Sequence, residues 1–290
     1  MHLRHIFKPQ EEILRVFSDF ELYNKILIHY SNLSLESAKV LEIGFGARPN
    51  RLFALTSIGV DACGVDLEMP VFRGNPREFL AILKENGAER FLKTIVRFLL
   101  FDSVERCYLA KALHKRGYKF EIHKDSFFVD DAANLEIQPQ SLDLIFSEDV
   151  FEHIPPPSLK VLIPKMAQWL KPNGLALIRP NIFTGITGGH LAEWFPQALE
   201  NKNMLRKSEP WEHLTKKRYR ANTYLNQLSR SDYRNLFGSS FHILEERVKE
   251  PSLGREFLSP EVLVNLKGYT DEELFSNLTL FILKPKNEFR

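Results

Sequence analysis

The chain has 290 residues, enough for one large domain, or for a core with insertions, around a sizeable hydrophobic core. Its hydrophobic content of 44% and charged content of 26% are typical of a globular protein, and a net charge of +2 creates no general field that would attract nucleic acid or an anionic membrane. No run approaches the ~20 apolar residues of a membrane span, and the first residues show no signal-peptide pattern. The two cysteines, Cys63 and Cys107, have no metal or redox spacing, so we expect a reduced, cytoplasmic protein.

In the first half of the chain, predicted strands alternate with predicted helices. Apolar residues at helical spacing predict an amphipathic helix over residues 11–30, before a strand at 39–43. A helix at 48–58 and a second strand at 62–68 follow. The pattern from 70 to 118 is helical throughout and longer than an ordinary strand–helix–strand connection, so we interpret it as a helical insertion.

The second half continues this alternation. The predicted elements are strands at 126–129 and 141–147, a helix at 157–170 closed by an Asn-Gly turn, a strand at 175–178, a second insertion at 181–230, a helix at 231–237, and strands at 241–248 and 279–283. Such alternation indicates an α/β, Rossmann-like, doubly wound fold with a mainly parallel seven-stranded sheet and helical insertions. We divide the chain into an N-terminal helical extension, 1–37, and one domain, 38–290, that carries both insertions.

A glycine turn follows the first predicted strand at once, in the sequence Glu42-Ile43-Gly44-Phe45-Gly46. The glycines let the backbone turn sharply and approach a ligand with no Cβ in the way. A dinucleotide site needs a third glycine for close helix–strand packing, and this chain has Pro49 there. Glu42 would also place a carboxylate near the phosphates. Because a carboxylate suits a ligand with a cationic end and no phosphate, the loop favours S-adenosylmethionine over a nicotinamide dinucleotide.

Six short segments occur in a characteristic order along the chain. They are LEIGFG (41–46), GVD (64–66), DAANL (131–135), SLDLIFS (141–147), VFEHI (150–154) and WLKPNG (169–174). In this order they resemble the class I S-adenosylmethionine-dependent methyltransferases, specifically the type 11 small-molecule branch. The resemblance covers about residues 38–180, and the last strands match the closing hairpin of that family.

The resemblance implies roles for the residues at the ends of the first two strands. Glu42, Gly44 and Gly46 would line the methionine end of the cofactor. Asp66 ends the second strand, where a carboxylate can accept from both ribose hydroxyls. Glu68 is the alternative for that role, and a turn or helix cap is the structural alternative for Asp66.

The next two strands would complete the cofactor site. The resemblance implies that Asp131 accepts from the adenine amino group and that Ala132 adds a backbone contact. Asp130 is the alternative acceptor, and a solvated loop is the structural alternative for the pair. Ser147 would close the pocket at the end of the fourth strand, where open α/β sheets bind ligands.

Two histidines are the candidates for catalysis. Methyl transfer is an in-line displacement that depends on positioning, and a base is needed only for a hydroxyl or a protonated amine. His153 follows the fourth strand, with packing at a helix start as its structural alternative. His190 follows the fifth strand, where Glu193 and Trp194 would help it to read a polar, ring-shaped substrate. The alternative is a loop-to-helix cap with Trp194 in a small separate core.

Metal and nucleic acid are not expected ligands. The spacing of His190 and Glu193 resembles a metal pair only loosely, and no third ligand is evident, so no metal is predicted. The basic run at 216–220 fits a solvated face better than a site for an acidic or phosphorylated acceptor. The fourth strand ends in SEDV and lacks the Asn/Asp-Pro-Pro-aromatic motif of nucleic-acid amino methyltransferases, and no Pro-Cys pair exists for cytosine C5 chemistry.

The sequence therefore predicts S-adenosylmethionine-dependent methyl transfer to a small-molecule acceptor. A sugar or cell-surface glycan precursor is the first candidate, because of the insertions and the Trp/His/Glu grouping. The alternative is a non-catalytic regulatory or partner-binding protein on a cofactor fold. The presence of Glu42, Gly44, Gly46 and Asp66 argues against that alternative, since decayed sites lose these features.

Overall fold

The computed structural model describes residues 8–200, 205–219 and 224–286. Contacts divide the chain into two compact units. The first comprises Met1–Glu136 and Leu142–Leu144, and the second comprises Ile137–Ser141 and Ile145–Arg290.

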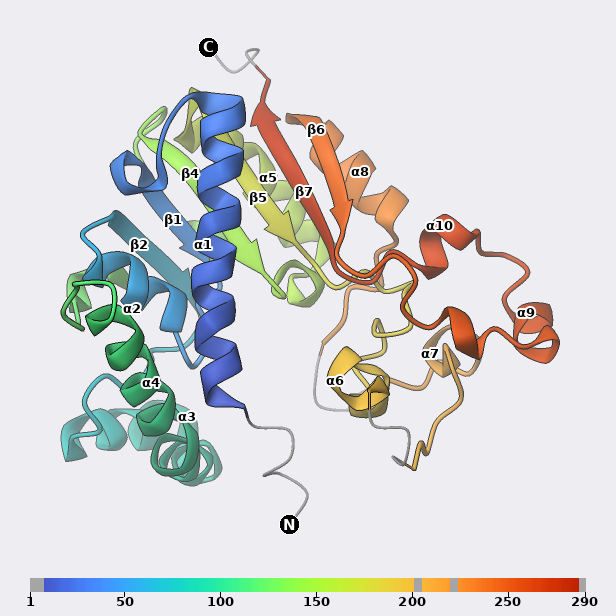
Figure 1. The fold of residues 1–290 in the computed structure, drawn as a ribbon, viewed down its shortest axis with the longest axis horizontal. Coiled ribbons are helices and arrows are strands. Elements are labelled where there is room, and N and C mark those ends of the chain that lie inside the picture. The colour runs from blue at the N-terminus through green and yellow to red at the C-terminus, as the bar shows by residue number, and fades with distance from the viewer. Residues whose placement is uncertain (1–7, 201–204, 220–223, 287–290) are drawn as a thin grey trace. The chain divides into compact units, whose positions relative to one another are not determined.

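The strands form one seven-stranded sheet in the order β3-β2-β1-β4-β5-β7-β6 (Figure 1). Their bounds are β1 Lys39–Ile43, β2 Asp61–Asp66, β3 Phe127–Val129, β4 Leu142–Glu148, β5 Leu170–Arg179, β6 Phe241–Val248 and β7 Thr279–Pro285. Strand β2 pairs in parallel with β1 and β3, whereas β7 runs antiparallel to both β5 and β6. The predicted Rossmann-like α/β class with a mainly parallel sheet is confirmed.

Helices and short helical turns separate the strands. The helices are α1 Pro9–Ser31, α2 Asn50–Ser57, α3 Pro76–Arg97, the π-helical η3 Phe98–Asp102, α4 Ser103–His114, α5 Pro156–Trp169, α6 Pro196–Leu199, α7 Glu212–Thr215, α8 Arg230–Gly238, α9 Pro260–Asn265 and α10 Asp271–Leu274. The 3-10 turns are η2 Leu35–Ser37, η4 Lys124–Ser126, η5 Ala132–Asn134, η6 Phe151–His153, η7 Ala192–Trp194 and η8 Arg255–Phe257. Among the described helices, none has both the length and the apolar character needed to cross a membrane.

The predicted elements differ from the structure in three places. Strand β5 begins at Leu170, five residues before the predicted strand, because the residue after α5 is already extended and the Asn-Gly pair lies within the strand. The insertion at 181–230 is less helical than predicted, since its described part holds only η7, α6, α7 and the first residue of α8. Helices α9 and α10 were not predicted. The division into an extension and one domain stays a prediction.

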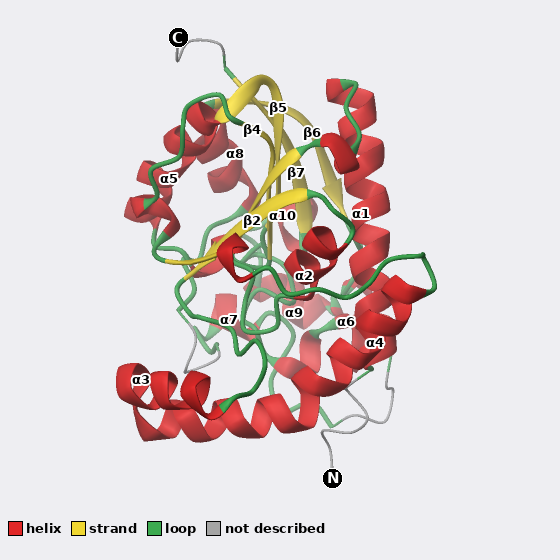
Figure 2. Ribbon diagram, turned by 90° about the vertical axis from the view of Figure 1, so that its left-hand side faces the viewer, coloured by secondary structure: helices red, strands yellow, loops and turns green. Residues whose placement is uncertain are grey.

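In the first unit, a helical layer supports the β1 loop. Helix α1 packs on α4 and α2, and α2 packs on β2 (Figure 2). Phe127 lies at the centre of an aromatic cluster, with ring centroids 5.0 Å from Phe72 and 5.3 Å from both Phe53 and Phe45. Because Phe45 belongs to the glycine turn, this cluster fixes the turn to the core.

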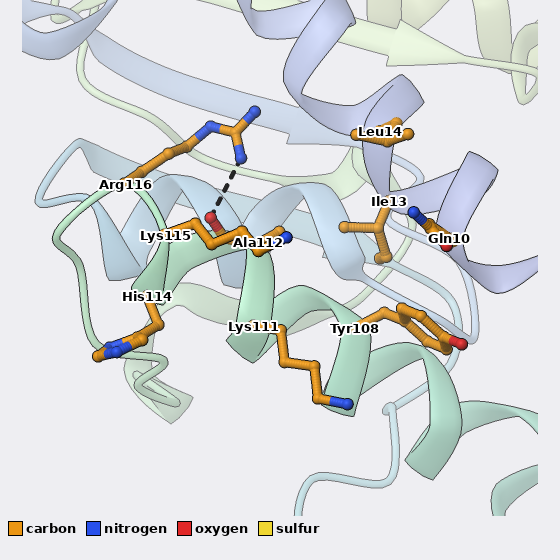
Figure 3. Close-up of a pocket in the computed structure, with 9 residues that line it drawn as sticks. All are labelled: Gln10, Ile13, Leu14, Tyr108, Lys111, Ala112, His114, Lys115 and Arg116. Atoms are coloured by element: carbon orange, nitrogen blue, oxygen red, sulfur yellow. Dashed lines mark hydrogen bonds between the residues drawn. The ribbon is translucent and has the colours of Figure 1, made fainter.

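A cavity of about 390 Å³ lies along α1 and α4 (Figure 3). It is lined by Gln10, Ile13, Leu14, Tyr108, Lys111, Ala112, His114, Lys115 and Arg116. None of the predicted site residues lines it, so its walls belong to helix packing and not to the predicted cofactor site.

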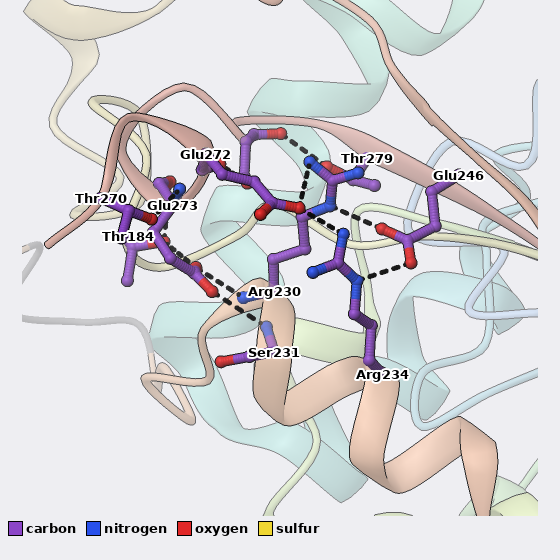
Figure 4. A network of polar contacts seen from close by, with 10 residues as sticks. Thr184, Arg230, Ser231, Arg234, Glu246, Thr270, Glu272, Glu273 and Thr279 are labelled. Atoms are coloured by element: carbon purple, nitrogen blue, oxygen red, sulfur yellow. Dashed lines mark hydrogen bonds and ion pairs between the residues drawn. The ribbon is translucent and has the colours of Figure 1, made fainter.

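In the second unit, charged side chains join α8 to β6 and α10 (Figure 4). Arg230 and Arg234 each donate through Nε to Glu246, at 2.6 Å. Glu273 accepts from the backbone amides of Arg230 and Ser231, at 3.0 and 3.1 Å, which caps the first turn of α8. This network fixes the C-terminal elements around the antiparallel part of the sheet.

His213 makes the stability of the second unit depend on pH. Its side chain is buried, its Nε2 donates to the carbonyl oxygen of Phe183 at 2.8 Å, and burial lowers its pKa to about 4. The unfolded chain therefore takes up a proton near pH 6.5, where the folded chain does not. Stability attributable to His213 is complete above pH 6.5 and falls by at most about 1.4 kcal/mol per unit as the pH drops towards 4.

Urea unfolding between pH 4.5 and 7.5 measures this dependence. We expect His213→Asn to flatten the curve, because asparagine keeps a donor and does not titrate. His242→Asn, at an exposed position on β6, serves as the control and should keep the wild-type slope. Equal slopes for all three chains would contradict the assignment.

Candidate active site

The turn after β1 has the backbone that the glycines predict. Gly44 and Gly46 have φ angles of 79° and 67°, in the left-handed region that favours glycine. The amide of Gly44 donates to the carbonyl oxygen of Val65 at 2.8 Å, which continues the β1–β2 ladder into the turn. With Phe45 buried in the aromatic cluster, the turn is held from both sides.

Asp66 lies beside this turn and not in a separate loop. Its Oδ2 accepts from the amide of Gly46 at 2.8 Å, and its Oδ1 accepts from the amide of Glu68 at 3.1 Å. Burial raises the pKa of the Asp66 carboxyl, and the hydrogen bond from Gly46 opposes that shift. The Asp66 carboxylate thus joins the two segments, at the ends of β1 and β2, that are predicted to bind the cofactor. It also holds a turn, which is the structural role given above as the alternative for Asp66.

Glu42 is buried at the end of β1, at 1% exposed surface. Its Oε1 lies 3.9 Å from Nη1 of Arg51 on α2, and Arg51 also contacts Asp19 on α1 at 3.5 Å. Arg51 therefore contacts two carboxylates, one on α1 and one at the end of β1.

Asp131 and Asp130 hold the turn after β3. Oδ1 of Asp131 accepts from the amide of Ala133 at 2.9 Å and caps η5. Oδ1 of Asp130 accepts from the amide of Asp131 at 2.7 Å. Ala132 is buried within η5. Both aspartates thus orient the backbone of this turn.

In the second unit, β4 ends in a sharp turn. Ser147 is buried at 1% exposed surface, and Glu148 pairs with Arg179 at the end of β5. Asp149 then takes a left-handed φ of 56°, while its amide donates to the carbonyl oxygen of Arg179 at 3.0 Å. The reversal leads directly into η6, which carries Glu152 and His153.

Glu152, His153 and His190 form a cluster in the second unit. Nε2 of His153 lies 3.9 Å, and Nε2 of His190 lies 3.8 Å, from Oε1 of Glu152. The two imidazole rings meet edge to face with centroids 5.0 Å apart. The two candidate catalytic histidines, 37 positions apart in the chain, are therefore neighbours around one carboxylate.

The Glu152 carboxylate has little to stabilise its charge. It is buried, and neither oxygen accepts a hydrogen bond of normal geometry from any described residue. Burial raises the pKa of Glu152 well above its usual value, and the charges of Asp149 and Glu148 raise it further. The backbone amides of Glu152 and Asn181 oppose this rise in the pKa.

Hydrogen bonds fix the tautomers of both histidines. Nδ1 of His153 donates to the carbonyl oxygen of Tyr224 at 2.9 Å, which leaves the lone pair on Nε2. Oδ1 of Asn181 accepts from Thr187 Oγ1 at 2.7 Å, so the amide nitrogen of Asn181 faces Nε2 of His190 at 3.4 Å. Nε2 of His190 is then an acceptor as well.

The loop before His190 leaves no room for larger side chains. His190 itself has a left-handed φ of 52°. A Cβ on Gly188 would overlap the carbonyl of Phe183, and a Cβ on Gly189 would lie 2.8 Å from Cβ of His213. The Gly-Gly pair is therefore required by the close packing of this loop.

The proposed grouping of His190 with Glu193 and Trp194 is wrong. Glu193 accepts from Ser208 Oγ at 2.7 Å. Trp194 is buried in a small core with Ile186, Trp211, Leu266, Leu274 and Phe275, as the structural alternative predicted. Of the three residues grouped to read a ring-shaped substrate, only His190 belongs to the cluster with Glu152 and His153.

The basic run also follows its structural alternative. Lys216 pairs with Glu209 at 2.6 Å, and Arg218 pairs with Glu212 at 3.3 Å. Arg220 lies outside the described residues. The described charges of this run are therefore partly balanced by acids of the same unit.

Sequence reasoning missed Glu152, Asn181 and Tyr224. Glu152 directly precedes His153 in VFEHI, but adjacent side chains on a regular strand or helix point apart. In η6 the two side chains instead lie beside each other. Tyr224 contributes its backbone carbonyl, for which side-chain identity gives no signal.

The family match and the fold identify the chain as an S-adenosylmethionine-dependent methyltransferase of class I. The family model described as a methyltransferase domain matches residues 17–237, and the chain belongs to this family. The cofactor is S-adenosylmethionine, and the protein is an enzyme. No curated protein matches the sequence.

Several solved structures are similar to this chain. A putative S-adenosylmethionine-dependent methyltransferase from Listeria monocytogenes is 13% identical, with 94% of this chain and 99% of that chain covered and a TM-score of 0.47. A methyltransferase from Methanosarcina mazei is 17% identical, with 90% and 96% covered and a TM-score of 0.44. Phosphoethanolamine N-methyltransferase 2 of Haemonchus contortus, in complex with S-adenosyl-L-methionine, is 17% identical, with 90% and 52% covered and a TM-score of 0.43.

We expect Gly188→Ala to destabilise the second unit by about 1–3 kcal/mol, because the new Cβ meets backbone atoms that cannot move independently. Chemical denaturation measures the change. Gly238→Ala is the matched control: no atom lies within 4 Å of its Cβ, so its stability should stay within about 0.5 kcal/mol of wild type. If Gly188→Ala had the same free energy of unfolding as wild type, the loop would not be tightly packed.

Proposed function

We propose that this enzyme transfers the methyl group of S-adenosylmethionine to a hydroxyl of a small-molecule acceptor, and that the acceptor is a sugar or a cell-surface glycan precursor. The observation that supports it best is the cluster of Glu152, His153 and His190. A sulfonium methyl needs no further activation, but a hydroxyl must lose its proton during transfer. A site with two acceptor nitrogens and a carboxylate suits that requirement.

The cofactor side of the proposal rests on the first unit and Ser147. Glu42, Gly44 and Gly46 are proposed to line the methionine end, where the buried charge of Glu42 suits an ammonium or sulfonium group. Asp66 is proposed to accept from the ribose hydroxyls.

Asp131, Ala132 and Ser147 complete the proposed cofactor contacts. The backbone of η5, which Asp131 orients, is proposed to meet the adenine. We do not propose nucleic acid as the acceptor. We do propose a cytoplasmic location, because the two cysteines form no disulfide.

Asp66→Asn tests the cofactor contacts. We expect it to weaken S-adenosylhomocysteine binding at least about tenfold, because an amide cannot accept from two hydroxyls with the strength of a carboxylate. Isothermal titration calorimetry measures the affinity. Asp61→Asn, at the other end of β2, is the matched control and should bind as wild type does. Equal affinities for both variants would remove Asp66 from the site.

His153→Ala and His190→Ala test the acceptor side. We expect each to lower kcat by about 10²–10⁴, the usual contribution of a positioned proton acceptor, with S-adenosylhomocysteine affinity unchanged. Release of S-adenosylhomocysteine is followed with a panel of sugars and nucleotide sugars as acceptors. Wild-type turnover in both variants would exclude the histidines from catalysis, and turnover restricted to amine acceptors would overturn the hydroxyl assignment.

A further inference from the structure

The cluster in the second unit brings three electron-rich atoms together. His153 donates through Nδ1 to the carbonyl oxygen of Tyr224, which leaves the lone pair on its Nε2, whereas Nε2 of His190 itself accepts from the amide nitrogen of Asn181 at 3.4 Å. Both nitrogens face Oε1 of Glu152, at 3.9 and 3.8 Å. Two imidazole nitrogens and a carboxylate oxygen gathered in this way favour a positive charge among them, because the carboxylate is buried.

The geometry has room for such a charge. One ligand atom from each of the three residues lies within 4.8 Å of the other two. Some point is therefore at most about 2.8 Å from all three, and small side-chain rotations reach the roughly 2.0–2.2 Å of a zinc–nitrogen or zinc–oxygen bond. The carboxylate is the buried, unsatisfied member of the set.

The surroundings are those of a metal centre. Nδ1 of His153 donates to a backbone carbonyl, which is the usual outer contact that fixes a metal-binding imidazole. Asp149 adds negative charge nearby, while the charge of Glu148 is balanced by Arg179. The contact from Asn181 to His190, at 3.4 Å, is long enough to be exchanged for a metal bond.

We propose that Glu152, His153 and His190 bind one divalent first-row transition ion, such as Zn²⁺, through two imidazole nitrogens and one carboxylate oxygen. Imidazole ligands favour such an ion over Mg²⁺ or Ca²⁺, which prefer oxygen. Three protein ligands leave a further coordination position open. If the proposed methyl transfer to a hydroxyl holds, this position would take the acceptor oxygen and lower its pKa. The hydroxyl proton would then pass to solvent, and the two histidines would act as metal ligands in place of proton acceptors.

Metal binding is measured on the untagged full-length chain, without cofactor or acceptor. After chelator treatment and dialysis, Co²⁺ and Zn²⁺ are titrated, with visible Co²⁺ absorption and competition against a chromophoric chelator as readouts. We expect one ion per wild-type chain and ligand-field bands typical of a nitrogen and oxygen site. Glu152→Gln and His190→Ala should each weaken binding at least about 100-fold.

His123→Ala is the matched control. His123 also faces a glutamate, Glu121, at 3.6 Å, but on the surface of the first unit, so its loss should leave stoichiometry and affinity unchanged. Should a buried variant fail to fold, as judged by circular dichroism, His153→Ala carries the test, because that side chain is 34% exposed.

Two results would overturn the proposal. One is the absence of stoichiometric binding by the wild-type chain, which would indicate that a proton supplies the positive charge. The other is binding that persists in Glu152→Gln and His190→Ala, which would place the metal elsewhere. Binding of S-adenosylhomocysteine is measured separately. Its absence would show that the proposed methyl transfer fails independently of the metal site.

Discussion

The second unit depends on how it accommodates the Glu152 carboxylate. A buried carboxylate is costly unless it is hydrogen-bonded or paired, and this one lies beside two imidazole nitrogens with no hydrogen bond of normal geometry from the described residues. The surrounding structure is arranged to keep those nitrogens there. The left-handed Asp149 turns the chain into η6, and the packed Gly188 and Gly189 hold the loop that carries His190. The conformations of these two turns therefore keep the two histidines beside the buried carboxylate.

The first unit treats its acids differently. Asp66 is partly buried, and both of its oxygens accept from backbone amides of neighbouring turns. Asp131 and Asp130 likewise fix local backbone. These carboxylates hold the backbone of their own turns, whereas neither oxygen of Glu152 accepts a hydrogen bond of normal geometry from a described residue. The two units thus use buried and half-buried acids in different ways.

The sequence was a good guide where local rules govern the structure. Strand β1 and its glycine turn follow from an apolar run and from residues that tolerate positive φ, and both lie where predicted. The start of β5 did not follow, because an Asn-Gly pair signals a turn while pairing and burial decide whether a strand passes through it. The insertion at 181–230 is less helical than predicted for a related reason. Its apolar side chains, Trp194 and Trp211 among them, serve a small core made by distant residues, and such packing has no period along the chain.

The same distinction explains the candidate site. His153 and His190 were identifiable one at a time, since each follows a strand that ends near the ligand edge of an α/β sheet. Their meeting around Glu152 depends on two loops whose conformations are set by tertiary contacts, Asn181 with Thr187 and Asn226 with the carbonyl oxygens of Phe151 and Ile154. A third ligand could not be recognised before those loops were placed. The glycine turn after β1 is encoded locally, whereas the meeting of the two histidines at Glu152 is encoded in the packing of the second unit, so the two are accessible to sequence reasoning to different degrees.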